Sequence, residues 1–301
     1  MDPKVKVARL SIISNTLLTI GKLLVGLTIN SVSIISEAIH SGMDLLASLI
    51  AYFSVRQSGK PADEQHQYGH GKFENVASVT EALLIVGAGV IIVFNSYQKL
   101  VSGKIEIHTL DHGLGIMALS VVANVYVSAR LFAVGKTTES PALIADGWHL
   151  RTDVFTSLGV FAGILAIRIT GLTILDPLVA IAVALLIIKT GIQLSRDSLR
   201  SILDARLPED EEKVIIEVIM AYSSEFIEFH KLRTRRAGPE RYVDLHLVLP
   251  SHLAVDQAHD LCDRIEAEIT RRLAYMHVLI HAEPCAGNCP ECLQSCPVGK
   301  R

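Results

Sequence analysis

The stretch EAIHSGMDLLASLIAYFSV, residues 37–55, places a histidine and an aspartate inside a run that is otherwise apolar enough to cross a membrane. His40 and Asp44 are four residues apart, and a helix puts such positions on one face, one turn apart. The same spacing returns at His149 and Asp153 in IADGWHLRTD, residues 144–153. An aspartate at the centre of a membrane-spanning helix costs about 2.5 to 3.5 kcal/mol, so both aspartates need a compensating partner. Two such helices can bring four ligands together, and two His with two Asp suit tetrahedral zinc.

From the residues alone, two interpretations of this pattern stay open. The side chains can bind a divalent metal ion on a path through the bilayer, or form His–Asp hydrogen bonds that only hold helices together. The identical spacing of the two copies favours metal binding. Asp146, three residues before His149, is either a partner of that site or a residue near the start of its helix. Polar packing between helices explains other polar residues in or near the apolar runs at least as well as transport does: Asn15, Glu37, Glu81 and Asn124.

The composition is that of a membrane protein with a soluble part. Of the 301 residues, 50% are hydrophobic and 20% are charged, against roughly 25% charged in an ordinary soluble protein. Lys and Arg number 28 against 31 Asp and Glu, and only 5% of the residues are aromatic. This balance offers neither a basic footprint nor base-stacking surfaces, which argues against a nucleic-acid partner.

Six apolar runs are each near the roughly 20 residues that a bilayer core requires: about 10–29, 32–55, 77–98, 113–134, 142–168 and 174–195. The first is too long for the core of a signal peptide, so we expect it to be retained as a span. Six spans put both termini on one side. The connections on that side carry eight basic residues, Lys4, Lys6, Arg9, Arg56, Lys60, Lys72, Arg130 and Lys136, against Lys99, Lys104 and Arg168 on the other. The bias predicts cytoplasmic termini, and the short loops favour a prokaryotic inner (plasma) membrane.

After about residue 200 charges become frequent, which predicts a small soluble domain. Periodicity predicts helices at 208–221 and 255–273 and strands at 227–236, 240–249 and 276–282. The order αββαβ favours a sheet with helices on one face. We therefore divide the chain into a six-helix transmembrane domain (1–200), a cytoplasmic α+β domain (201–284) and a Cys-rich tail (285–301).

Further potential ligands lie outside the membrane spans. Asp63, His66 and His70 are three and four residues apart in the loop after the second span, where they can close on one ion or merely belong to a polar loop. In the C-terminal domain the spacing alone favours solvated surface residues over a site, although potential ligands recur on its strands and helix: His230, His246, His259, His281 and Glu283.

The tail carries four cysteines with gaps of three, two and three residues: Cys285, Cys289, Cys292 and Cys296. The gaps fit thiolate ligands around one soft ion. Two disulfides, or a disordered thiol-rich tail, fit them as well. Cys262 falls on the predicted helix at 255–273, and we expect it in the core.

Together, the six spans, the repeated H-x-x-x-D, PADEQHQYGHGKFE at residues 61–74 and IADGWHLRTD resemble the cation diffusion facilitator family over almost the whole chain. The resemblance implies a homodimer of six-span protomers that exports divalent metal in exchange for protons, with a ferredoxin-like αββαβ cytoplasmic domain. It implies a transport site at His40, Asp44, His149 and Asp153, and a loop site at Asp63, His66 and His70. It further implies a cytoplasmic site at His230, His246, His259, His281 and Glu283, where family members often have Asp in place of the last residue.

The resemblance and the ligand chemistry agree on zinc as the leading substrate, with cadmium or iron as further ones. Zinc is expected in two roles, as transported ion and as regulatory ion in the cytoplasmic site, without an organic cofactor. We expect alternating access in a bilayer-embedded homodimer, with proton coupling because metal binds only neutral imidazole. A metallohydrolase would need a general base and an open coordination position, so no enzyme activity is expected. The alternative function is a membrane metal sensor or scaffold that does not transport.

Overall fold

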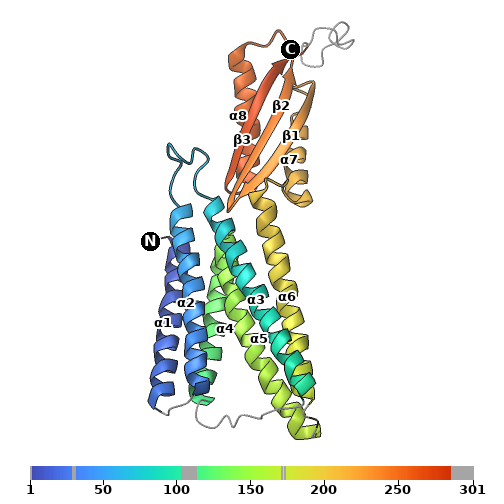
Figure 1. The fold of residues 1–301 in the computed structure, drawn as a ribbon. Helices are drawn as coiled ribbons and strands as arrows, with labels where there is room; N and C mark the ends of the chain where they lie inside the picture. The colour runs from blue at the N-terminus through green and yellow to red at the C-terminus, as the bar shows by residue number, and fades with distance from the viewer. Residues whose placement is uncertain (1, 29–31, 103–113, 171, 173, 286–301) are drawn as a thin grey trace. The chain divides into compact units, whose positions relative to one another are not determined.

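The computed structural model describes residues 2–28, 32–102, 114–170, 172 and 174–285. The chain divides into two compact units, Met1–Leu199 and Arg200–Arg301. Figure 1 shows long helices in the first unit, and a small sheet with helices in the second.

The first unit is built from six helices: α1 (Pro3–Thr28), α2 (Val32–Ser58), α3 (Lys72–Ser102), α4 (Leu114–Thr137), α5 (Pro141–Thr170) and α6 (Leu175–Ile202). Among the described residues, five of these helices contain a stretch long and apolar enough to cross a membrane. The sixth, α5, carries Asp146, Arg151 and Asp153 in its described part. The prediction of six transmembrane helices is confirmed, and the helices run several residues beyond the predicted spans.

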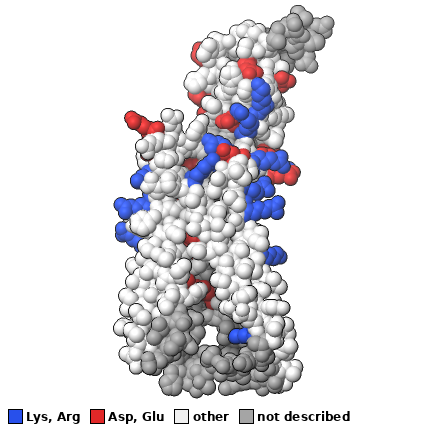
Figure 2. All heavy atoms as spheres, in the orientation of Figure 1, with Lys and Arg blue, Asp and Glu red and all other residues white. Residues whose placement is uncertain are grey.

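The helical unit has large apolar side chains outside and small or polar ones inside. Leu17 of α1 and Phe94 of α3 are 65% and 59% exposed. Ala47 and Ser48 of α2 and Ala82 of α3 are fully buried. Figure 2 shows a mostly uncharged surface along the middle of the helices, with Lys and Arg gathered near one end. Lipid explains this pattern, because helices in a bilayer associate through close packing of small residues and polar contacts.

Helices α3 and α6 pack closely at two glycines. A Cβ added at Gly89 would come within 2.6 Å of Ile188 Cγ1 and 3.3 Å of the Ala184 carbonyl oxygen. One added at Gly191 would come within 2.7 Å of Val86 Cγ2. Any larger residue at these positions therefore pushes the two helices apart.

The start of α5 is fixed by local chemistry. Pro141 suits the first helical position because its fixed φ matches the helix and its missing N–H is not needed there. The hydroxyl of Ser140 accepts a hydrogen bond from the backbone N–H of Leu143 at 3.4 Å, as an N-cap residue does. With the helix beginning here, Asp146 lies in its second turn and not at its start.

The second unit has the element order α7 (Glu209–Ala221), β1 (Glu228–Ala237), β2 (Glu240–Leu249), α8 (Val255–Arg272) and β3 (Met276–Pro284). The strand order is β1-β2-β3, with β2 antiparallel to β1 and parallel to β3. A parallel pair needs a crossover connection, and α8 provides it. The predicted αββαβ fold is confirmed.

Alternation along β2 separates its two faces. Val243, Leu245, Leu247 and Leu249 are buried in the core that α7 and α8 cover. The residues between them, which include His246, therefore lie on the opposite face. Cys262 belongs to the core, as its helix predicts. Cys289, Cys292 and Cys296 lie outside the described residues.

Candidate metal centres

The two H-x-x-x-D pairs meet between α2 and α5 in a crossed arrangement. His149 Nε2 lies 3.2 Å from Asp44 Oδ1, and His40 Nε2 lies 3.6 Å from Asp153 Oδ1. Each aspartate is thus paired with the histidine of the other helix. The H-x-x-x-D spacing makes this possible, because each helix presents one imidazole and one carboxylate a turn apart to its neighbour.

Three of the four side chains offer ligand atoms within 4.8 Å of one another: His40, Asp44 and Asp153. His149 adjoins this group through its contact with Asp44. Asp44 and His149 are buried, whereas the His40 side chain is 53% exposed. The group is therefore buried at Asp44 and His149 and exposed at His40. We call these four residues the membrane quartet.

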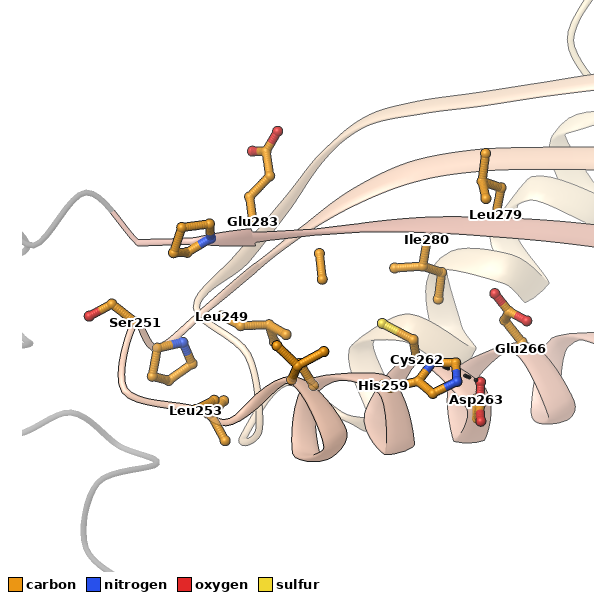
Figure 3. A pocket seen from close by; sticks show the side chains of 15 residues that line it. Leu249, Ser251, Leu253, His259, Cys262, Asp263, Glu266, Leu279, Ile280 and Glu283 are labelled. Carbon is orange, nitrogen blue, oxygen red and sulfur yellow. Dashed lines mark ion pairs between the residues drawn. The ribbon is translucent and has the colours of Figure 1, made fainter.

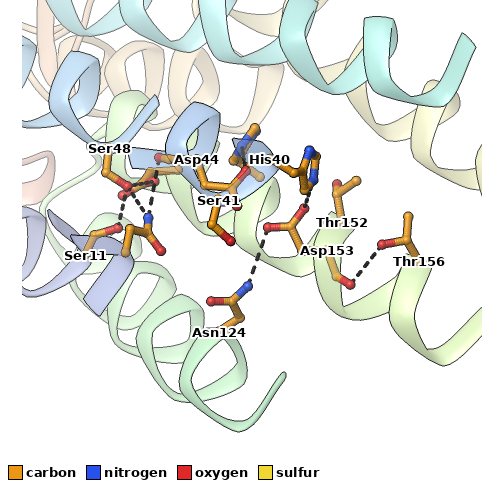
Figure 4. A network of polar contacts seen from close by, with 12 residues as sticks. Ser11, His40, Ser41, Asp44, Ser48, Asn124, Thr152, Asp153 and Thr156 are labelled. Atoms are coloured by element: carbon orange, nitrogen blue, oxygen red, sulfur yellow. Dashed lines mark hydrogen bonds and ion pairs between the residues drawn. The ribbon is translucent and has the colours of Figure 1, made fainter. Parts of the chain in front are cut away.

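A cavity of about 80 Å³ adjoins the membrane quartet. Figure 4 shows Asp153 and Asn124 pointing toward each other there, with 3.5 Å between Asn124 Nδ2 and Asp153 Oδ2. Lys22 of α1 also lines the cavity, and its Nζ donates a hydrogen bond to Ser41 Oγ at 2.7 Å. The sequence reasoning missed Lys22, although a charged residue in the middle of the first apolar run was a signal for it.

A network of small polar residues holds Asp44 from the α1 side. Asn15 Nδ2 donates to Ser48 Oγ at 2.7 Å and to the Asp44 carbonyl oxygen at 3.4 Å. Ser48 in turn donates to Asp146 Oδ1 at 3.2 Å, and its oxygen lies 2.9 Å from Ser11 Oγ. Figure 4 shows this network beside Asp44. Asp146 is therefore tied to the helix that carries Asp44.

The loop residues Asp63, His66 and His70 come together as their spacing allowed. Asp63 Oδ1 lies 3.5 Å from His66 Nδ1, and Asp63 Oδ2 lies 3.3 Å from His70 Nε2. All three offer ligand atoms within 4.8 Å of one another. Gly69, with φ at 79°, lets the chain turn back between the two histidines.

The loop carboxylate is held in its charged form by local backbone groups. The backbone N–H groups of His66 and Gln65 donate to Asp63 Oδ1 at 2.7 and 3.0 Å. These hydrogen bonds, that of His66 first, hold the pKa of Asp63 below its usual range. His70 is buried and its Nδ1 has no hydrogen-bond partner among the described residues. A carboxylate and two imidazoles that lie this close form a ready set for a divalent ion.

The third cluster follows from strand register. His230 of β1 lies opposite His246 of β2, which lies opposite His281 of β3. Residues at matching positions of neighbouring strands share one face of the sheet, and this face is the one away from the helices. A bulge follows His230, where Lys231 has φ at 52°. The register thus places three histidines in one row.

Glu283 completes this cluster, because it follows His281 by two residues on β3 and so lies on the same face. Glu283 Oε1 lies 2.6 Å from His246 Nδ1, and Glu283 Oε2 lies 3.3 Å from His230 Nε2. His281 Nε2 lies 3.6 Å from Glu283 Oε1. The hydrogen bond with His246 lowers the pKa of Glu283, and the carboxylate is charged throughout the neutral range.

His259 is not brought to this cluster within one chain. It lies on α8, on the helix-covered side of the sheet, 73% exposed and 3.5 Å from Asp263. Figure 3 shows His259 turned toward Asp263, and Glu283 with its carboxylate on the other side of β3. Both residues border a groove of about 520 Å³ between α8 and the end of β3.

Two family models match the chain. Residues 8–203 match the family model for the cation efflux transmembrane domain, and residues 207–285 match that for the cation efflux protein, cytoplasmic domain. A solved structure of CzrB in its Zn form is 33% identical and covers 28% of this chain and 94% of that chain, with a TM-score of 0.26.

Curated relatives cover most of the chain. The cation-efflux pump FieF of Yersinia enterocolitica is 33% identical over 294 residues, 95% of this chain and 96% of the relative. FieF of Serratia proteamaculans is 35% identical over 261 residues, 85% of this chain and 84% of the relative. The uncharacterized transporter sll1263 of Synechocystis is 34% identical over 255 residues, 84% and 82% of the two chains. With its six transmembrane helices, its αββαβ domain and these matches, the chain belongs to the cation diffusion facilitator family of cation efflux transporters.

Proposed function

We propose that the protein exports Zn²⁺ from the cytoplasm in exchange for protons, by alternating access in a homodimer, and that Cd²⁺ or Fe²⁺ are further substrates. The crossed membrane quartet is the observation that carries this proposal. Two carboxylates at membrane depth are costly without a cation. Four ligands, two imidazoles and two carboxylates, suit the tetrahedral coordination of Zn²⁺, a metal ion of borderline softness.

Proton coupling follows from the same ligands. Metal binds an imidazole only in its neutral form, and an unperturbed imidazole titrates near pH 6.5. Protons that arrive from the outer side therefore compete with the metal for His40 and His149. In this scheme zinc binds from the cytoplasmic side, the loaded helices rearrange to open outward, and protons displace the ion.

We propose regulatory zinc sites outside the membrane, one at Asp63, His66 and His70 and one at His230, His246, His281 and Glu283. The cytoplasmic site also includes His259, which lies apart within one chain, so we infer that a second protomer brings it into that site. Zinc held between two protomers would favour one geometry of the dimer. The basic residues counted in the connections support cytoplasmic termini, and the short loops support an inner-membrane location.

The test is zinc flux into proteoliposomes across an imposed pH gradient, with the wild type, Asp44→Ala and the control Asp210→Ala. Asp210 is an exposed residue of α7, and its removal is expected to leave the flux unchanged. Wild-type zinc flux coupled to opposite proton movement, lost by at least about tenfold in Asp44→Ala, is the expected result. Near-normal flux in Asp44→Ala would refute the assignment of the quartet. Stoichiometric zinc binding without any flux in the wild type would favour a sensor or scaffold.

A further inference from the structure

Glu81 of α3 is a buried carboxyl group in the middle of the helical unit. Its side chain is fully buried, and neither of its oxygens has a hydrogen-bond partner among the described residues. A bare carboxylate in such a place would be strongly destabilised, because no hydrogen-bond donor among the described residues compensates its charge. The group must therefore hold a proton in this conformation.

A second buried carboxyl group lies close enough to Glu81 for their charges to interact. Asp146 of α5 is also fully buried, and its charge interacts with that of Glu81. Asp146 Oδ1 accepts from Ser48, whereas Oδ2 has no partner among the described residues. Within the described part of the chain, no ionisable group of α2 or α6 interacts with Glu81 in this way. Ionising both of two neighbouring, fully buried carboxyl groups is strongly unfavourable, so the pair retains at least one proton.

Glu74 shows what a partnered carboxylate looks like in the same helix. It lies two turns before Glu81 and is equally buried. Lys4 Nζ lies 2.9 Å from its Oε1, and the hydroxyls of Ser58 and Ser140 also donate to it. Glu74 is thus compensated by a cation and by hydrogen bonds, and it serves the packing of the helix ends. Glu81 has neither kind of partner.

The carboxyl pair lies next to the membrane quartet without belonging to it. Asp146 precedes His149 by three residues, about 4.5 Å along the axis of α5. Ser48, which bonds Asp146, follows Asp44 by one turn on α2. The cavity at the quartet is lined by neither Glu81 nor Asp146. Two carboxyl groups without a basic side chain between them, as far as the described residues extend, form a site whose simplest ligand is a proton.

We infer that buried Glu81, with Asp146 as its neighbouring carboxyl group, is a proton-binding site distinct from the metal ligands, and that metal binding at the membrane quartet displaces its proton. The inference rests on the proposed zinc/proton exchange. The doubly charged ion, bound about one helical turn away at low dielectric, favours the ionised form of the pair. The O–H bond of Glu81 breaks, the electron pair stays on the carboxylate, and the proton leaves to water. After the metal departs, a proton returns to Glu81.

Infrared difference spectroscopy of the purified full-length protein, zinc-loaded minus zinc-free, tests this. Zinc is expected to remove the carbonyl stretch of a protonated carboxyl group in the wild type, and this change should vanish in Glu81→Gln. Gln resembles the protonated side chain, so the variant is expected to fold and to bind zinc. It should release about one proton fewer per zinc ion, measured by calorimetry in buffers of different ionisation enthalpy.

The exposed carboxyl variant Glu217→Gln is the control and should behave as the wild type. An unchanged infrared signal and proton release in Glu81→Gln would overturn the inference, and so would a wild type in which zinc removes no protonated carboxyl. Asp146→Asn should keep the band and shift its frequency, which separates Glu81 from its neighbour. Failure of the proposed function shows itself differently, as absent zinc flux in a wild type that still gives the infrared change.

Discussion

At the scale of single residues, Glu283 shows how one carboxylate organises three imidazoles. It lies at the end of β3 and contacts His246 and His230 at hydrogen-bond or ion-pair distance, with His281 two residues earlier on the same strand. Because the pKa of Glu283 is lowered, its carboxylate is already ionised at neutral pH. In the proposed cytoplasmic site, metal would require the neutral form of the histidines.

Removing His246 should reduce stability in a manner that depends on pH. The His246 hydrogen bond holds the pKa of Glu283 below its usual value, so its stabilising contribution is complete above the ordinary glutamate pKa of about 4.3 and is lost as pH falls through the lowered pKa. His246→Ala is therefore expected to unfold at a lower temperature than the wild type at pH 7, with the difference shrinking below about pH 4.3.

Thermal unfolding of metal-free protein over a pH series measures this difference. His252→Ala, which removes an exposed histidine of the same domain, should show no such pH-dependent difference. A constant offset between His246→Ala and the wild type from pH 7 to pH 3 would contradict the role given to the hydrogen bond.

At the scale of secondary-structure elements, the close approach of α3 and α6 depends on having no side chain at two positions. Gly89 and Gly191 face the partner helix, whereas Gly87, two residues earlier on α3, has no neighbour within 4 Å of an added Cβ. The hydroxyls of Ser78 and Ser198 join the same two helices at 2.7 Å. Small residues and one hydrogen bond thus take the place that a hydrophobic core has in a soluble protein.

Gly89→Ala and Gly87→Ala form a matched pair that tests this packing. Gly89→Ala is expected to destabilise the protein by about 1 to 3 kcal/mol because the methyl group overlaps Ile188 and the Ala184 carbonyl. Gly87→Ala should be neutral or stabilising by up to about 1 kcal/mol, since alanine favours the helix. Thermal unfolding in mild detergent measures both, and equal effects of the two changes would disprove the close approach.

Helices and strands could be predicted from sequence because their signals are local. The length of the apolar runs predicted the six transmembrane spans, and the periodicity of the apolar residues predicted the αββαβ order of the second unit. The helix ends could not be predicted in the same way: α3 begins at Lys72, five residues before the predicted span, because Lys4, Ser58 and Ser140 compensate the buried Glu74 outside the apolar run. These contacts come from three other parts of the chain, so no local pattern announces them.

At the scale of the whole molecule, the described residues contain three separate groups that could hold a metal ion, one in the transmembrane helices, one in a loop and one on a sheet. The H-x-x-x-D spacing predicted which four residues to examine in the membrane, but not that each aspartate pairs with the histidine of the other helix. That pairing depends on how α2 and α5 are rotated about their axes. Likewise, the row of three histidines could be recognised only once the strand register was known. The neighbours of Lys22 and Glu81 depend on how the helices pack around them.

If zinc bridges two protomers, it should change the geometry of the dimer. We expect the distance distribution between spin labels at position 217 of the two protomers to shift and narrow when zinc is added, because a bound ion favours one arrangement. Pulsed electron–electron double resonance measures this distance, on protein whose native cysteines have been replaced. His246→Ala should abolish the effect of zinc on this distance. An identical distance distribution with and without zinc in the wild type would contradict a zinc ion held between the two protomers.

The lysine beside the membrane quartet bears on how fast the transporter can cycle. Lys22 brings an amino group to a cavity that is also lined by the two carboxylates of the quartet and by the imidazole of His40. In the proposed transport mechanism, a cation that enters this cavity would be attracted by the carboxylates and repelled by the lysine, so it would be held less tightly than its ligand number alone would give. Very tight binding would slow the release of the ion, whereas weaker binding would shorten its residence time. Turnover, and not affinity, is the quantity that this residue favours.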